Sequence, residues 1–163
     1  DARSHIKQHF INLVDVVIAA YQQEQDNFQA SNIMFSLLPP PAPLLVPADA
    51  ELLVTAITHI LNNARQHTTA DGTVNLLLTH DDGHANVRIE DNGAGMSEEI
   101  QTHMFQRFYR GSNRRQLRGF GLGLPIVQRI VELHDGTINI DSTVNAGTTV
   151  TIRLPRAVTN TLT

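Results

Sequence analysis

The sequence predicts an α+β fold, a two-layer α/β sandwich in which a mixed, mostly antiparallel sheet packs against helices. Three observations predict it. Two long segments carry apolar residues at helical spacing, two alternating runs are joined by a tight turn at Asp82-Gly83, and two more alternating runs close the chain. Strands gathered on one side and helices on the other give two layers. At 163 residues, with 41% hydrophobic and 17% charged residues, the chain suits one domain spanning 1–163.

The first elements are a helix and two short strands. Residues 10–21 are apolar apart from Asn12 and Asp15, which predicts an amphipathic helix that continues to about residue 25. Strands are expected at 32–37 and 44–46. The proline-rich segment between them must be an extended connection, because proline fixes its backbone and cannot donate a hydrogen bond.

The second helix is predicted over residues 49–67, with Asp49 as its N-cap and Glu51 in its first turn. One side is apolar, and a second stripe carries polar side chains: His59, Asn63, Gln66 and His67. An asparagine oxygen is a hard, neutral ligand that can complete the shell of a phosphate-bound Mg²⁺. A solvent-facing helix surface is the alternative for each of these residues, most of all for His59 and Gln66.

Strands at 73–79 and 85–91 form the hairpin, and the second strand ends in a glycine-rich turn. Counting by twos places Asp91 on the inward face with Val87 and Ile89. Burying an unpaired carboxylate there would cost roughly several kcal/mol of free energy, so Asp91 needs a partner. Gly93 and Gly95 leave room for a flat ligand, and an adenine amine could donate to Asp91. A solvated turn is the alternative, since Asp, Asn and Gly are common turn residues.

A short helix is expected after Ser97, and a second glycine-rich turn, GFGLGL at 119–124, leads into another amphipathic helix with Pro125 in its first turn and Gly136 beyond its end. A helix amino terminus preceded by glycines can bind phosphate. A flexible hinge is the alternative. The spacing fits neither a dinucleotide fingerprint nor a Walker loop, and Lys7 is the chain's only lysine. Strands at 137–142 and 148–154 follow.

An arginine-rich segment lies between the two glycine turns. It contains Arg107, Arg110, Arg114, Arg115 and Arg118. Such a run is usually a solvated loop. Its position favours a mobile lid whose arginines neutralise a triphosphate, with Arg118 nearest the glycines.

Composition limits the remaining functional classes. The net charge of −4 argues against nucleic acid as a partner. The absence of cysteine excludes a thiolate metal site or a thiol nucleophile and suits a reducing compartment. With no apolar run long enough to cross a bilayer, we expect a soluble, monomeric, cytoplasmic fragment.

Taken together, the motifs resemble the ATP-binding catalytic domain of bacterial sensor histidine kinases. ILNNARQHT at 60–68 resembles the family's N box, DNGAGM at 91–96 its G1 box, MFQRFYRG at 104–111 its F box, and GFGLGL at 119–124 its G2 box. AGTTVTIRLP at 146–155 resembles the final strand. Five motifs in family order are far more specific than any one of them.

The resemblance implies a Bergerat-type fold of the GHKL class, with ATP and Mg²⁺ as ligands. Asn63 would hold Mg²⁺, Asp91 would read the adenine amine with support from Thr148, and Asn63 and Arg118 would serve catalysis. The full set of predicted nucleotide-binding residues is Asn63, Gln66, His67, Asp91, Gly93, Gly95, Arg118, Gly121, Leu122, Gly123, Leu124 and Thr148.

The implied reaction is in-line transfer of the γ-phosphoryl group to a histidine. No histidine here has the family's acceptor context, so the chain is expected to be a catalytic fragment whose acceptor lies in a separate dimerisation domain. Residues 1–9 would be the tail of that domain's helix, and 156–163 a loose end. The full protein, expected in the cytoplasm or anchored in the cell membrane, would pass the phosphoryl group to a response regulator.

Three positions depart from the family's pattern. His59 stands where these kinases usually have asparagine, Gln66 where a basic residue often touches phosphate, and Gln106 where the F box is usually acidic. His59 would then support the groups that bind the metal and would not bind the metal itself. Two alternatives stay open: an ATP hydrolase of the same superfamily, whose water-activating glutamate would occupy position 59, and a degenerate binding module that transfers nothing.

Overall fold

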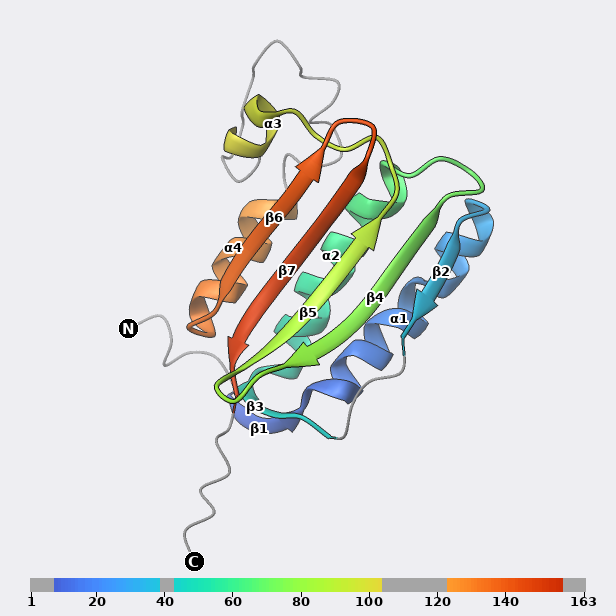
Figure 1. Cartoon of the computed structure of the whole chain (residues 1–163). Coiled ribbons are helices and arrows are strands. Elements are labelled where there is room, and N and C mark those ends of the chain that lie inside the picture. Colours follow the sequence, from blue (N-terminus) through green and yellow to red (C-terminus); the bar gives the residue numbers. More distant parts are fainter. Residues whose placement is uncertain (1–7, 39–42, 104–122, 157–163) are drawn as a thin grey trace, which may run out of the picture.

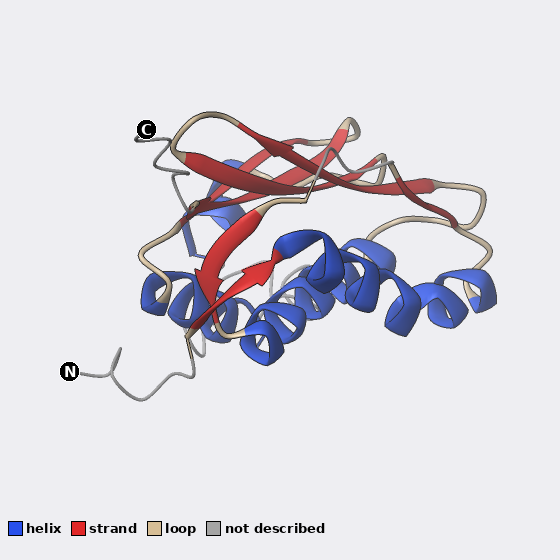
Figure 2. Cartoon of the chain, turned by 90° about the horizontal axis from the view of Figure 1, so that it is seen from below, coloured by secondary structure: helices blue, strands red, loops and turns tan. Residues whose placement is uncertain are grey.

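A five-stranded sheet forms one layer of the molecule and helices form the other (Figures 1 and 2). The computed structural model describes residues 8–38, 43–103 and 123–156. The helices are α1 (Leu13–Ala30), α2 (Ala50–Gln66), α3 (Glu98–His103) and α4 (Gly123–Leu133). The strands are β1 (His9–Asn12), β2 (Met34–Leu37), β3 (Leu45–Ala48), β4 (Thr73–His80), β5 (His84–Asp91), β6 (Thr137–Thr143) and β7 (Gly147–Pro155).

The main sheet has the strand order β2-β4-β5-β7-β6. Only β2 and β4 are parallel, and the other three pairings are antiparallel. The β4–β5 hairpin turns at the predicted Asp82-Gly83. The predicted two-layer sandwich with a mixed, mostly antiparallel sheet is therefore confirmed.

The amino-terminal segment differs from the prediction. Residues 9–12 form β1 and pair with β3 in a separate two-stranded sheet, whereas we expected the first helix to begin at residue 10. The helix starts after Asn12, whose Oδ1 accepts the backbone N–H of Val14 and that of Leu44, each at 3.1 Å. Asn12 therefore stops the strand, caps α1 and holds the approach to β3. The helix also runs past residue 25 to Ala30.

The helices α1, α2 and α4 cover one face of the sheet, with α1 packed on α2 and α2 on α4 (Figure 2). As predicted, Asp49 caps α2, and its carboxylate accepts the N–H of Leu52 at 3.3 Å. Alternate residues of β4, β5 and β7 point into the core between the layers and are buried. This apolar face ends, at one end of the sheet, in the polar side chain of Asp91.

Within the described residues, no helix combines the length and hydropathy needed to span a membrane. The two predicted tails lie mainly outside those residues, since only His9, which belongs to β1, and Gln8 and Arg156 are described.

Candidate functional site

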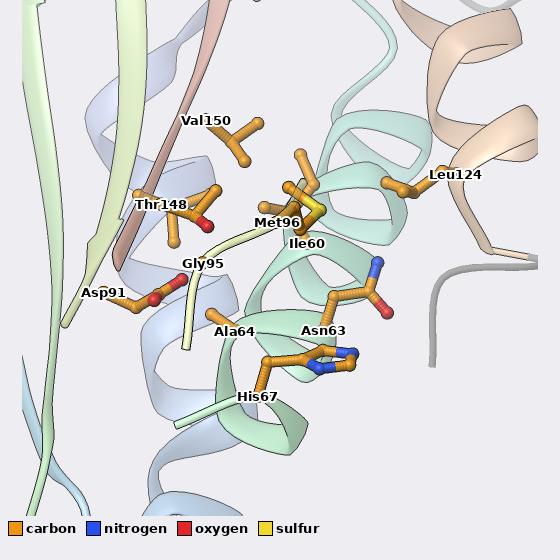
Figure 3. Close-up of a pocket in the computed structure, with 11 residues that line it drawn as sticks. Ile60, Asn63, Ala64, His67, Asp91, Gly95, Met96, Leu124, Thr148 and Val150 are labelled. Carbon is orange, nitrogen blue, oxygen red and sulfur yellow. The ribbon is translucent and has the colours of Figure 1, made fainter. Parts of the chain in front are cut away.

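A pocket opens between α2, the end of β5, the turn after it and the beginnings of α4 and β7 (Figure 3). It encloses about 430 Å³ of space between protein atoms, part of it open to solvent. Six predicted site residues line it together with five apolar ones: Ile60, Asn63, Ala64, His67, Ile89, Asp91, Gly95, Met96, Leu124, Thr148 and Val150. Residues far apart in the sequence thus meet as the motif analysis predicted.

Asp91 is the acidic group of the pocket. It follows the buried Val87 and Ile89 on the inner face of β5, as the alternation predicted, and its carboxylate faces the pocket (Figure 3). One carboxylate oxygen accepts the N–H of Gly93 at 2.8 Å. Burial raises the pKa of Asp91, while backbone N–H groups of Gly93 and Thr148 partly offset that rise. The fold holds an acceptor in place in poorly hydrated surroundings.

The glycine turn brings the backbone very close to its neighbours. A Cβ on Gly93 would overlap the carbonyl of His67, and one on Gly95 would overlap the carbonyl of Thr143. Gly95 also has φ +72°, in the left-handed region that favours glycine. The N–H of Ala94 donates to the His67 carbonyl at 3.2 Å. Both glycines thus serve close backbone packing, and Gly95 in addition forms part of the pocket wall.

Helix α2 supplies the opposite wall through Asn63 and His67. Asn63 is 8% exposed, and its side-chain nitrogen has no hydrogen-bond partner among the described residues. Figure 3 shows its amide at the edge of the pocket. Burial lowers the pKa of His67, so this imidazole is neutral near pH 7.

The other polar residues of α2 lie away from the pocket. Gln66 is exposed, and neither Gln66 nor His59 is among the lining residues. His59 is half-buried and exerts an electrostatic effect on Glu24 of α1. The predicted phosphate contact of Gln66 and the supporting role of His59 stay predictions.

Helix α4 brings its first turn to the pocket, where Leu124 is buried. Gly123 is the first residue of this helix. The other predicted phosphate-side residues, Arg118, Gly121 and Leu122, lie outside the described residues, as do the F box and the arginine-rich segment. Their roles stay predictions.

The sequence reasoning missed the apolar part of the wall. Ile60 lies one turn before both Asn63 and Ala64 on α2, and Val150 follows Thr148 on the same face of β7. These periodicities were a usable signal, because residues sharing a face with a site residue belong to the same wall. Met96 carried no such signal, since it follows an irregular turn.

An apolar slot with a carboxylate at one end suits a flat heterocycle that carries an amine. Apolar walls bury the ring faces, and a fixed acceptor selects the donor on its edge. A purine with an exocyclic amino group has both properties.

The match to known proteins agrees with this geometry. The model of the family described as "Histidine kinase-, DNA gyrase B-, and HSP90-like ATPase" matches residues 48–158, which include every residue that lines the pocket. The chain belongs to this family. The identification from the sequence motifs is thereby confirmed, and the pocket is the candidate nucleotide site of the ATPase family fold.

The chain is similar in sequence to sensor histidine kinases. It is 40% identical over 97 residues to "Sensor histidine kinase YvrG" of Bacillus subtilis, covering 59% of the chain and 17% of that protein. It is 39% identical over 118 residues to "Probable sensor histidine kinase TcrY" of Mycobacterium tuberculosis, covering 71% and 25%. The chain therefore spans a quarter or less of the length of these curated relatives.

Solved structures agree. A structure described as "Mycobacterial sensor histidine kinase MprB" superposes with a TM-score of 0.78 at 27% identity, over 93% of this chain and 99% of that one. The catalytic domain of histidine kinase ThkA superposes with a TM-score of 0.80 over 93% and 99%, and at 22% identity it shows the shared fold.

Proposed function

We propose that this domain binds Mg²⁺-ATP and presents the γ-phosphoryl group to a histidine of a dimerisation domain, as the kinase module of a two-component signalling system. The observation that carries the proposal is the Asp91 carboxylate at the end of an apolar slot. The named sensor kinases among its relatives support this reaction over other activities of the family.

Adenine recognition follows from the donors and acceptors of the slot. The carboxylate of Asp91 is held by the N–H of Gly93 and is poorly solvated, so a ligand that donates to it recovers part of the cost of burial. Ile60, Ile89 and Val150 provide apolar surface for the ring. An adenine amine meets the carboxylate while the ring lies against aliphatic side chains.

The residues present also fit a magnesium ion on the phosphates. The described residues contain no group of three His, Cys, Asp or Glu side chains that could hold a metal ion by itself. Asn63 has a side chain at the pocket edge whose nitrogen the described protein does not use, and its oxygen is a neutral ligand of the kind Mg²⁺ accepts. Asn63 would hold the ion, and Mg²⁺ would supply charge neutralisation on the phosphates during transfer.

In this proposal the chain's own residues catalyse by positioning. Asp91 and the slot fix the base, and Asn63 fixes the metal-phosphate end, which leaves the terminal phosphoryl group oriented toward an incoming histidine. Arg118 and the second glycine turn would hold the phosphates and keep water away. The acceptor is the histidine nitrogen of the dimerisation domain, and a response regulator would receive the phosphoryl group afterwards.

Supplying labelled ATP together with a dimerisation domain from the same parent protein tests the reaction. The proposal expects label on the histidine. Release of free phosphate alone would instead indicate a hydrolase, and transfer of nothing would indicate a binding module. Asp91→Asn should abolish labelling, whereas the matched change Asp141→Asn, at an exposed position of β6, should leave it intact.

Replacing Asn63 with alanine should mainly reduce the Mg²⁺-dependent part of ATP binding, because the amide oxygen would be lost while the adenine slot stays. Calorimetric titrations of ATP with and without Mg²⁺ measure this difference. Asn139→Ala, on the exposed face of β6, is the matched control. An unchanged Mg²⁺ dependence in the Asn63 variant would contradict the assigned role.

A further inference from the structure

Three polar side chains form a row across the inner face of the sheet. Asp91 on β5 pairs in register with Thr148 on β7, and Thr148 pairs with Ser142 on β6. The next row on the same face consists of Ile89, Val150 and Ile140 and is entirely aliphatic. Asp91 and Thr148 line the pocket, and Ser142 lies behind them. A polar residue that faces the core needs hydrogen-bond partners.

Ser142 finds those partners in the row and in the glycine turn. Its Oγ is 2.7 Å from Oγ1 of Thr148, accepts the N–H of Met96 at 2.8 Å, and can donate to the carbonyl of Gly147 at 3.2 Å. One half-buried hydroxyl therefore joins the pocket's threonine to the turn that follows Asp91.

The direction of the hydrogen bond between Ser142 and Thr148 determines whether Thr148 can donate a hydrogen bond into the pocket. Ser142 has one hydroxyl proton and can direct it either to Gly147 or to Thr148. The contact with Thr148 has the usual length for an O–H···O bond, whereas the contact with the Gly147 carbonyl lies beyond the usual range. The lengths favour Ser142 as the donor to Thr148, and in that arrangement the proton of Thr148 can point into the pocket.

We propose that Ser142 is a positioning residue for base recognition, which makes Thr148 a donor beside the acceptor Asp91. This pairing fits a base edge that carries an amine next to a ring-nitrogen acceptor, as adenine does. Hypoxanthine presents a carbonyl next to a ring N–H, so its edge is reversed. The inference rests on the proposed nucleotide-binding function and names the residue behind its base selectivity.

The structure offers a matched control in Gln101 of α3. Its side-chain nitrogen donates to the carbonyl of Met96 at 2.9 Å and to that of Ser142 at 3.1 Å. Gln101 fastens the same two segments as Ser142 but touches neither hydroxyl. A loosened turn should follow from loss of either residue, whereas a change in base selectivity should follow only from loss of the Ser142 hydroxyl.

The experiment compares dissociation constants for ADP and IDP by calorimetry in the wild type and in Ser142→Ala, Ser142→Cys and Gln101→Ala. The wild type should prefer ADP. Ser142→Ala should weaken ADP binding by about fivefold, the worth of one hydrogen bond, with a much smaller change for IDP. Ser142→Cys, which keeps the size but is a poor donor, should behave likewise. Gln101→Ala should leave the ratio of the two constants as in the wild type.

The inference is overturned if both Ser142 variants keep the wild-type ratio, or if Gln101→Ala lowers it equally. Melting curves without nucleotide report any general loss of stability separately. A wild type that binds neither nucleotide would overturn the proposed function, and this inference with it. A wild type that prefers ADP, with an unchanged ratio in the Ser142 variants, would overturn the inference alone.

Discussion

At the scale of single residues, the position of Asp91 favours nucleotide binding but lowers the stability of the nucleotide-free domain at neutral pH. The carboxylate is useful to a ligand because it is poorly hydrated, and the same burial raises its pKa. Since the folded pKa lies above the value of 3.8 for an exposed aspartate, the folded state binds protons more readily than the unfolded state. The contribution of Asp91 to stability is therefore fully present below pH 3.8 and is lost as pH rises through the folded pKa.

Asp91→Asn should accordingly raise the unfolding midpoint of the nucleotide-free domain at pH 7, because it removes a partly buried charge and keeps an oxygen for the Gly93 N–H. The gain should shrink at pH 4, where the wild-type group is partly protonated. Thermal unfolding of both proteins at the two pH values measures this. Asp141→Asn serves as the control, and a gain at pH 4 as large as that at pH 7 would refute the explanation.

Single-residue predictions succeeded where a local period decided the outcome. Alternation along β5 was enough to turn Asp91 inward. Helical spacing placed Asn63 and His67 on one wall, but it also grouped them with His59 and Gln66, which do not line the pocket. Glu24 was out of reach of such reasoning. It lies in a polar stretch of α1, yet it is only 6% exposed, and burial raises its pKa. Its environment depends on α2, which packs against α1 from more distant sequence. Ser142 likewise becomes meaningful only through the register of β6 and β7.

At the scale of elements, His134 joins the two helices that frame the pocket. It is almost fully buried just after α4, and its Nδ1 lies 2.7 Å from the carbonyl of Ile130. Its Nε2 accepts the backbone N–H of Asp49, the N-cap of α2, at 3.0 Å. Because Nε2 accepts this hydrogen bond, Nδ1 is the nitrogen that donates to the carbonyl of Ile130. The end of α4 is thus fixed to the start of α2.

His134→Leu should lower the free energy of unfolding by about 1–3 kcal/mol, since the Asp49 N–H would be left without its acceptor in a partly buried site. Chemical denaturation measures the change. His9→Leu, at an exposed position of β1, should have little effect and provides the control. Equal stability of the two variants would show that the bridge contributes nothing.

Element boundaries were predictable where caps and turns are local. Asp49 marked the start of α2, and Asp82-Gly83 marked the hairpin. The strand β1 was missed because only Asn12 separates its apolar residues, Phe10 and Ile11, from the apolar residues that begin α1. What makes residues 9–12 a strand is pairing with β3, and β3 lies beyond the whole of α1. The local periodicity of a sequence does not show pairing with a strand so far along the chain.

At the scale of the whole molecule, each of the two layers provides one side of the slot. The sheet carries the row of Asp91, Thr148 and Ser142, while α2 and α4 bring Asn63 and Leu124 to the other side of the slot (Figure 3). The family and the fold were predictable because five motifs occur in a fixed order. Among the described residues, the N box lies at the end of α2 and the G1 box at the end of β5.

The most direct measurement is calorimetric titration of ADP into the wild-type domain, Asp91→Asn and Asp141→Asn. If Asp91 reads the base, the wild type and Asp141→Asn bind one ADP with equal affinity, and Asp91→Asn, still folded by circular dichroism, shows no binding. Wild-type affinity in Asp91→Asn would contradict the account.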